Sequence, residues 1–80
     1  MMEPIRITLE KGGSTYPDNP HEGEEFGYVL SGSICLILGN RIIRVRKGES
    51  FYFTANTTHY IRASEKTGAT LIWVSTPPSF

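Results

Sequence analysis

The sequence predicts an all-β domain, either a closed barrel or a double-sheet jelly roll. Short runs of β-forming residues are separated every few residues by glycine, serine or asparagine, which is the spacing of many short strands. No window shows a sustained hydrophobic period of 3.6 residues, so little or no helix is expected. Eighty residues make a single domain, residues 1–80, and leave no room for a DNA-binding domain in this chain.

Seven or eight short strands are expected from the punctuation of the chain. Residues 5–10 alternate apolar and polar side chains, as a strand with one buried face does. Gly39 and Asn40 suit a tight hairpin turn, residues 31–33 are expected to end a strand, and the prolines at 77 and 78 stop the last one because proline has no N–H for the ladder. The strands expected are therefore residues 5–10, 26–30, 34–38, 41–46, 51–53, 58–63 and 69–74.

The charge of the chain argues against direct nucleic-acid binding. Eight lysines and arginines balance eight acidic residues, so the excess of positive charge that drives phosphate binding is missing. The densest basic stretch alternates along an apolar strand, and a solvated strand face explains it better than a phosphate patch. Its members are Arg41, Arg44, Arg46 and Lys47.

Several features predict a cytoplasmic protein that does not enter the membrane. No apolar stretch approaches the about 18 residues of a membrane span. The N-terminus lacks the basic region, apolar core and small-residue cleavage site of a signal peptide. The single cysteine, Cys35, lies in an apolar run and is expected to be a small buried hydrophobic residue in a reducing compartment.

The chain has only two histidines, and the first belongs to a spaced pattern. Between Gly13 and Gly32 the sequence resembles the first motif of the cupin family, a glycine, five residues, a His-x-His pair, a glutamate and a glycine. His21 occupies the second histidine position and Glu25 the glutamate position, whereas Asn19 stands where the first histidine is usual. The resemblance implies a cupin-type β-barrel (a double-stranded β-helix or jelly roll) with these residues at its site.

The second histidine fits the second cupin motif only in part. Gly48 and His59 have the family spacing, whereas Thr54, Asn56 and Ala63 stand where proline, glycine and asparagine are usual. The hairpin over residues 33–47 separates the two motifs, and this short separation is typical of compact bacterial cupins. The cupin resemblance covers residues 13–63.

The spacing of the polar residues requires a turn if they are to form one site. On one straight strand His21 and Glu25 would lie about 13 Å apart. Gly23 permits a sharp turn that puts His21 at the end of one strand and Glu25 at the start of the next. With His59 arriving from a neighbouring strand, two imidazoles and a carboxylate would suit divalent iron, nickel, manganese or zinc.

A metal-free pocket remains an alternative to that metal site. In this interpretation His21 and His59 are hydrogen-bonding residues of the pocket, and Glu25 recognises a cationic ligand, because a buried carboxylate needs a positive partner in either case. Asn19 is a poor substitute for a histidine ligand of a metal, although it remains a candidate ligand-binding residue.

A closer resemblance extends over nearly the whole chain. The segments HEGEEFGYVL and TPPSF are similar to the C-terminal domain of bacterial regulators that carry an N-terminal helix-turn-helix of the xenobiotic-response-element type. The resemblance implies a cupin sensor domain of a transcription regulator, either excised or a stand-alone homologue, that binds a small-molecule effector in its lumen. The effector-binding residues expected are His21, Glu25, His59 and Asn19.

Two other functions remain open at the level of sequence. A small metal-dependent cupin enzyme, of the oxygenase or isomerase type, would use the same three candidate ligands. A purely structural barrel would leave the inward-facing polar residues unexplained. In each case a homodimer is expected, because so short a chain has strand edges to protect and little core.

Overall fold

The computed structural model describes residues 3–76, and this part of the chain consists of strands and connecting loops without a helix. The predicted all-β class is therefore confirmed. Residues 3–76 contain six strands, whereas the sequence predicts seven or eight. Their bounds are β1 Glu3–Leu9, β2 Glu24–Leu38, β3 Arg41–Arg46, β4 Ser50–Thr54, β5 His59–Ala63 and β6 Ala69–Thr76. The prolines at 77 and 78, which were predicted to stop the last strand, lie outside the described residues.

The prediction that residues 31–33 end a strand is wrong. β2 runs through them for 15 residues, with an irregularity between Val29 and Ser31 in its pairing with β6. Gly32 has a φ of 71°, and a Cβ there would lie 2.1 Å from the carbonyl oxygen of Gly68. A glycine–serine stretch therefore bends this strand without interrupting it, because glycine can adopt the left-handed conformation that the bend requires.

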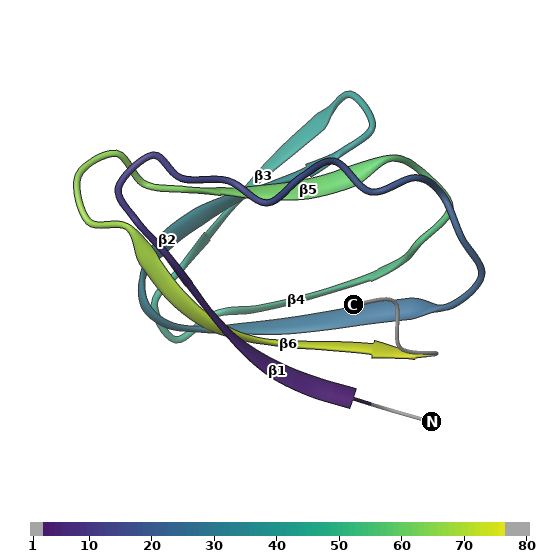
Figure 1. Cartoon of the computed structure of the whole chain (residues 1–80), viewed down its shortest axis with the longest axis horizontal. Coiled ribbons are helices and arrows are strands. Elements are labelled where there is room, and N and C mark those ends of the chain that lie inside the picture. The colour runs from purple at the N-terminus through teal and green to yellow at the C-terminus, as the bar shows by residue number, and fades with distance from the viewer. Residues whose placement is uncertain (1–2, 77–80) are drawn as a thin grey trace.

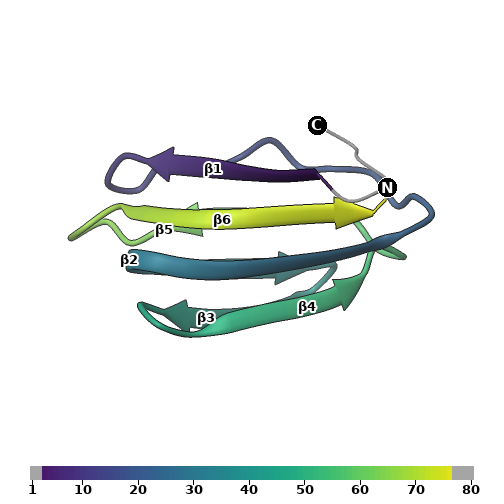
Figure 2. The ribbon, with the colours of Figure 1, turned by 90° about the horizontal axis from the view of Figure 1, so that it is seen from below.

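The bend makes β2 a member of two sheets that pack against each other. Sheet A has the order β1-β6-β2-β4 and contains the first half of β2, whereas sheet B has the order β3-β2-β5 and contains the second half. All of these strand pairs are antiparallel. Figure 1 shows the two layers, with β3 and β5 lying across from β4 and β6, and Figure 2 shows the strands of sheet A side by side.

The core lies between the two sheets and follows the alternation of the strands. β6 alternates buried and half-buried positions along its whole length, and β2 alternates exposed and buried positions in its first half. Full burial of one such aliphatic side chain contributes about 1.5–3 kcal/mol. The fully buried aliphatic residues include Val29, Ile34, Leu36, Ile61 and Leu71.

Two features of sheet B bear on the sequence predictions. The hairpin at Gly39 and Asn40 is confirmed, because Leu38 and Arg41 pair directly across it. Cys35 is half-buried on the outer side of β2, so the expectation that it is buried is wrong. The cause is alternation, since Ile34 and Leu36 on either side of it take the inward positions.

The basic stretch lies on β3, where its three arginines are exposed. This placement agrees with the solvated strand face expected from the sequence. Within residues 3–76 there is no helix long and apolar enough to cross a membrane.

Candidate metal centre

A loop that runs along β5 positions the first histidine. The N–H of Asp18 donates to the carbonyl of His59 over 2.8 Å, and the N–H of His59 donates back to Asp18 over 3.0 Å. The N–H of His21 donates to the carbonyl of Ala55 over 2.8 Å. His21 therefore lies in a loop fixed by backbone hydrogen bonds. The sequence predicted it at the end of a strand, and this prediction is wrong.

The turn expected at Gly23 is present and delivers the glutamate. Gly23 has a φ of 122°, a conformation that side-chain-bearing residues rarely adopt, and β2 begins at the next residue. Strand alternation then exposes Glu24 and buries Glu25, whose exposed fraction is 2%. The outward carboxylate of Glu24 accepts a hydrogen bond from the Tyr52 hydroxyl over 2.5 Å.

The second histidine enters from the other sheet. His59 is the first residue of β5, pairs with Leu38 of β2, and is 1% exposed. Ile61, two residues further along, faces the same interior because side chains alternate along a strand, and it is fully buried. The ring of Phe53 packs edge-to-face on the His59 ring at a centroid distance of 5.1 Å, which restricts the imidazole.

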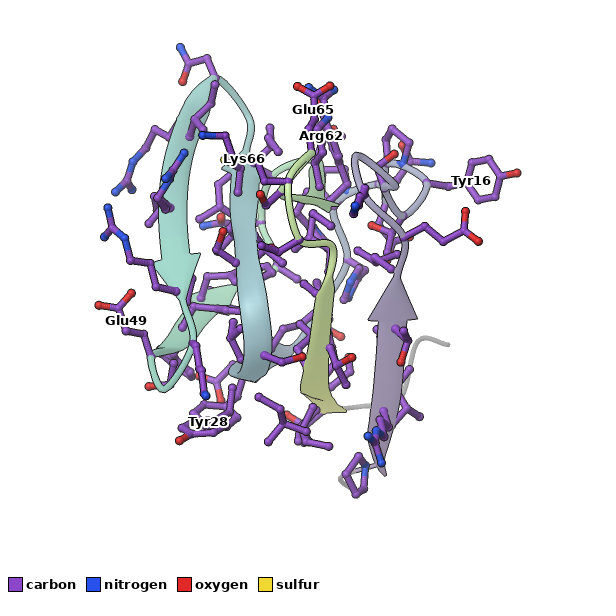
Figure 3. The ribbon with its side chains drawn as sticks, turned by 90° about the vertical axis from the view of Figure 1, so that its left-hand side faces the viewer. Tyr16, Tyr28, Glu49, Arg62, Glu65 and Lys66 are labelled. Atoms are coloured by element: carbon purple, nitrogen blue, oxygen red, sulfur yellow. The ribbon has the colours of Figure 1, made fainter. Side chains whose placement is uncertain are left out.

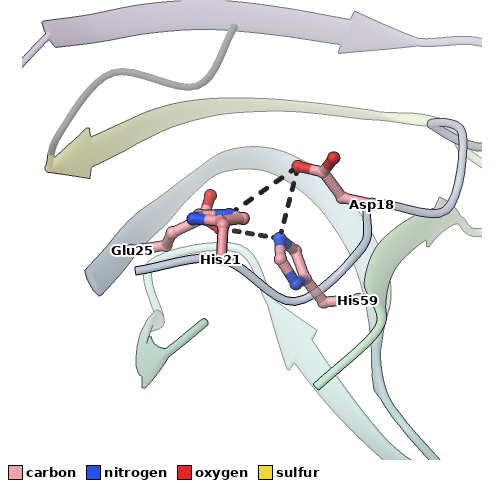
Figure 4. Close-up of side chains that lie close together, drawn as sticks. All are labelled: Asp18, His21, Glu25 and His59. Atoms are coloured by element: carbon pink, nitrogen blue, oxygen red, sulfur yellow. Dashed lines mark hydrogen bonds and ion pairs between the residues drawn. The ribbon is translucent and has the colours of Figure 1, made fainter. Parts of the chain in front are cut away.

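His21, Glu25 and His59 converge on one point, and Asp18 joins them (Figure 4). Glu25 Oε2 lies 2.7 Å from His59 Nε2 and 3.2 Å from His21 Nε2. Asp18 Oδ2 lies 3.5 Å from His59 Nε2 and 3.9 Å from His21 Nε2. One potential ligand atom from each residue lies within 4.8 Å of all the others, so the group could hold a metal ion.

Backbone carbonyls hold a proton on Nδ1 of both imidazole rings. Nδ1 of His21 lies 2.9 Å from the carbonyl oxygen of Glu22, and Nδ1 of His59 lies 2.9 Å from that of Thr57. Because a carbonyl oxygen only accepts, each Nδ1 carries a proton and donates it. In the neutral rings Nε2 is then a bare lone pair directed at the cluster, and such outer hydrogen bonds are usual for histidines that bind metals.

The buried His59 Nε2 provides the test of whether a metal fits. Among residues 3–76 this atom has no hydrogen-bond partner of acceptable geometry, although Glu25 Oε2 is only 2.7 Å away. Two facing lone pairs at this distance repel each other, and either a proton on Nε2 or a metal ion that binds both atoms removes the repulsion. A metal ion that binds two atoms lies to one side of the line between them. His59 Nε2 and Glu25 Oε2 can therefore bind the same ion without having the geometry of a hydrogen bond to each other. Ligands about 2.0–2.2 Å from an ion are spaced about 3 Å apart, close to the distances found here.

Trp73 holds the other oxygen of the glutamate. Its indole Nε1–H donates to Glu25 Oε1 over 2.5 Å, and both residues are buried. The Phe51 ring packs edge-to-face on the indole at 5.4 Å. Gly27 makes room for that ring, because a Cβ at position 27 would lie 2.1 Å from it. Only Oε2 of Glu25 therefore faces the cluster, and a role for Trp73 is not visible in the sequence pattern.

The surroundings of His21 favour its protonated form in the metal-free protein. The hydrogen bond to the Glu22 carbonyl is the largest cause of a pKa raised above the ordinary value of 6.5. Partial burial lowers the pKa, while the nearby carboxylates of Glu25 and Asp18 raise it. A proton on His21 therefore competes with a metal ion for Nε2.

Asn19 is the one predicted site residue that the structure leaves outside the cluster. Its side chain is exposed, and the preceding residue, Asp18, contributes its carboxylate to the cluster instead. The motif spacing from Gly13 predicts Asn19 at the site. The backbone pairing of Asp18 with His59, which decides between the two neighbours, has no signature in the sequence.

A small cavity adjoins the cluster. Its volume is about 110 Å³, and Asp18, Glu25, His59, Tyr60 and Trp73 are among the residues that line it. Tyr60, the residue after His59, is half-buried at the cavity wall. A larger cavity of about 370 Å³ opens between β3 and β4 and includes none of the cluster residues.

Comparison with known proteins identifies the family of this chain. Residues 5–75 match the family described as the cupin domain, and the chain belongs to the cupin family. A search of curated proteins finds no match.

Solved cupin structures resemble the chain closely in fold. The cupin domain of a transcriptional regulator of the XRE family from Enterobacter cloacae has 19% identity and a TM-score of 0.83, with 98% of this chain and 83% of that chain covered. The polyketide cyclase RemF from Streptomyces resistomycificus has 26% identity and a TM-score of 0.78, with 92% and 53% covered. An RmlC-like cupin from Shewanella frigidimarina has 23% identity and a TM-score of 0.78, and this chain spans 64% of its length.

Proposed function

We propose that the chain is a small-molecule sensor domain of a transcription regulator and that its effector binds beside a divalent metal ion. The observation that supports this most directly is the convergence of four ligand atoms next to a small cavity. The similarity in fold to the cupin domain of an XRE-family regulator, which extends over 98% of this chain, supports the regulatory context. A cytoplasmic location belongs to the same proposal.

In this proposal Nε2 of both histidines and one oxygen each of Glu25 and Asp18 hold the ion. Two nitrogen and two oxygen donors suit zinc, manganese, iron or nickel. The ion, when bound, supplies a Lewis-acidic position for an oxygen or nitrogen atom of the effector. The protein residues fix the imidazoles, orient the carboxylate and exclude water from the buried side. Asn19, exposed beside Asp18, remains a predicted effector contact at the mouth of the site.

The outer face of sheet A is proposed as the surface that pairs with a second copy of the chain. Four large side chains on this face are exposed, namely Phe26 (41%), Tyr28 (40%), Leu30 (39%) and Tyr52 (62%). Apolar residues gathered on one face of a small protein mark an interaction surface. Figure 3 shows Tyr28 projecting from the surface of the molecule. Pairing through this face produces the expected homodimer.

Alternation along two strands connects the site to that surface. On β2, Glu25 points inward and Phe26 points outward, and on β6 the buried Trp73 is followed by Val74 on the outer side. Phe26 and Val74 are direct neighbours across the β2–β6 pair. A shift of Glu25 or Trp73 when the effector binds is thereby carried to the dimer surface, which is how a sensor changes the spacing of attached DNA-binding domains.

The metal part of the proposal is tested by elemental analysis of the purified protein after incubation with zinc, manganese, iron or nickel. About one equivalent per chain is expected in the wild-type protein. His21→Ala, at a half-buried loop position, and His59→Ala should each lose the ion. Circular dichroism of His21→Ala checks that the fold persists. Equal metal content in wild type and both variants would contradict the site.

The regulatory part is tested by the reading frame upstream of Met1 in the parent genome. A helix-turn-helix region in frame with this chain is expected.

A second candidate, a small metal-dependent cupin enzyme, is supported by the same cluster and by the similarity to a polyketide cyclase. An enzyme and a sensor differ in what happens to a bound molecule. The metal-loaded protein is incubated with a molecule that it binds, and the mixture is examined by mass spectrometry. Recovery of the unchanged molecule supports the sensor, whereas conversion that depends on the metal supports the enzyme.

A further inference from the structure

The cavity beside the cluster is small, and part of its lining is apolar. Ile7 of β1, Trp73 of β6 and Tyr60 of β5 contribute to its wall. Its volume of about 110 Å³ lies well below the about 300–1,000 Å³ of pockets for drug-sized ligands. An engineered cavity of about 150 Å³ in another protein holds a benzene molecule. The part of a ligand that this cavity encloses is therefore benzene-sized or smaller and apolar.

The charges at the cavity come from two carboxylates. Asp18 and Glu25 lie on its wall, and no lysine or arginine is among the described residues that line it. Two neutral imidazoles, two carboxylates and one divalent ion sum to zero charge. A centre with one carboxylate and three imidazoles would instead keep a net charge of +1. Asp18 thus removes the positive charge that would attract an anionic ligand.

An anion would also meet Asp18 directly. This carboxylate is half exposed, with 52% of its side chain accessible, and its Oδ2 lies 3.5 Å from His59 Nε2. A negatively charged ligand that reached the ion would give up its hydration at a centre of zero net charge and come close to that carboxylate, with no lysine or arginine among the described lining residues to compensate. An uncharged ligand of the same size avoids both costs.

We infer that the cavity takes a small uncharged molecule with an apolar body and one oxygen or nitrogen group directed at the cluster, and that Asp18 excludes anions. This inference rests on the proposed function of the cluster as an effector site. It assigns to Asp18 a role in selecting the ligand in addition to that of holding the ion.

Butyramide and butyrate provide matched probes, because they are nearly equal in size and shape and differ in charge. Each is titrated into zinc-loaded protein, and binding is followed by the fluorescence of Trp73, the single tryptophan of the chain, which lines the cavity. The wild-type protein should bind butyramide about tenfold more tightly than butyrate, because a unit charge a few ångströms from a partly solvated carboxylate costs roughly that much.

Two substitutions separate the role of Asp18 from a general charge effect. Asp18→Asn, with zinc loading verified, should reduce the preference for butyramide about tenfold by improving the binding of butyrate. Glu65→Gln removes one negative charge at the exposed turn between β5 and β6, away from the cavity, and should leave the preference unchanged. Equal binding of both probes by the wild type, failure to bind butyramide, or an unchanged preference in Asp18→Asn would overturn the inference.

Failure of the proposed metal site is recognised separately. Zinc content is measured in the same samples, and a protein that retains none contradicts the metal part of the proposed function. The probes are then compared on the metal-free protein, where the two carboxylates lack the neutralising ion and the preference for butyramide over butyrate should persist. Its absence there would again overturn the inference.

Discussion

Trp73 Nε1 lies 2.5 Å from Glu25 Oε1, so the single tryptophan of the chain holds one oxygen of the buried carboxylate. The other oxygen, Oε2, faces both histidines. A carboxylate fixed in this way offers one oxygen to an ion and keeps its orientation when the ion leaves. Hydrogen bonds of this kind are shorter and stronger than those between neutral groups.

Replacing Trp73 with Phe should weaken metal binding by about 10–100-fold, the range typical for loss of a hydrogen-bond partner to a metal ligand. The substitution removes the indole donor and leaves Glu25 Oε1 buried without it. Competition with a coloured chelator measures the affinity without relying on tryptophan fluorescence.

Tyr52→Phe is the matched control for this prediction. It removes the hydroxyl that donates to Glu24, the neighbouring carboxylate on the outer face of β2. Metal affinity should stay at the wild-type value. Equal effects of the two substitutions would mean that the donor to Glu25 has no specific role.

Asp18→Asn should weaken metal binding, whereas Asn19→Ala should leave it unchanged. Asp18 contributes a carboxylate to the cluster, whereas Asn19 is exposed beside it. Loss of a direct ligand should weaken zinc binding by more than about tenfold, since loss of an outer partner alone costs that much. Asn19→Ala should bind zinc as the wild type does. Calorimetry with zinc measures both, and a weaker Asn19→Ala would restore the motif position as a ligand.

The effect of zinc on thermal stability should grow with pH through the titration of His21. The pKa of this histidine is raised in the metal-free fold, chiefly by its hydrogen bond to the Glu22 carbonyl. The stability that its protonation contributes is present below the ordinary value of 6.5 and is lost as pH rises through the raised pKa. Zinc requires the deprotonated ring, so its stabilisation has the opposite dependence.

Melting temperatures with and without zinc, measured from about pH 5 to pH 8, test this expectation. The shift caused by zinc should increase across that range in the wild type. His21→Gln should show a smaller shift with a weaker dependence on pH. A shift that is constant with pH in the wild type would mean that His21 does not bind the ion.

Phe26→Lys should convert the dimer to a monomer. A lysine at this position places a charge in the centre of the exposed apolar face of sheet A, where burial against a second copy is unfavourable. Sedimentation at micromolar concentration should give twice the chain mass of 9.0 kDa for the wild type and the single mass for the variant.

Ile42→Lys provides the control for the dimer surface. Ile42 is 71% exposed on the outer face of sheet B, so the same change in charge is made on the opposite layer. This variant should remain dimeric. A monomeric Ile42→Lys together with a dimeric Phe26→Lys would assign the interface to sheet B.

Much of the fold could be predicted from local patterns. The hairpin at Gly39 and Asn40 and the exposure of Glu24 beside the buried Glu25 follow from turn chemistry and alternation, which depend on neighbouring residues only. The sequence predicts a strand end at residues 31–33, where the structure has a bend at Gly32 within β2. Sequence shows that a glycine can leave the extended conformation, but whether the same strand continues beyond it depends on partners such as Gly68, far along the chain.

The candidate site was predictable to a similar extent. The motif spacing of His21, Glu25 and His59 was enough to predict that they form one site. The turn at Gly23 brings the first two together, and His59 joins them from the second sheet. Asp18 and Trp73 could not be found in this way. Their positions depend on the pairing of a loop with β5 and of β6 with β2, which are contacts between distant segments.

The long β2 strand also determines when the site can form during folding. β2 pairs with four other strands, and Glu25 lies near its start, while Leu38, the partner of His59, lies at its end. These pairings join segments far apart in the chain, and such topologies fold slowly because loops must close before the contacts are gained. Glu25 and His59 meet only after both halves of β2 have found their sheets. Acquisition of metal-binding capacity during refolding should therefore coincide with recovery of the native fold, and the ion would act on the completed fold and not as a nucleus for it.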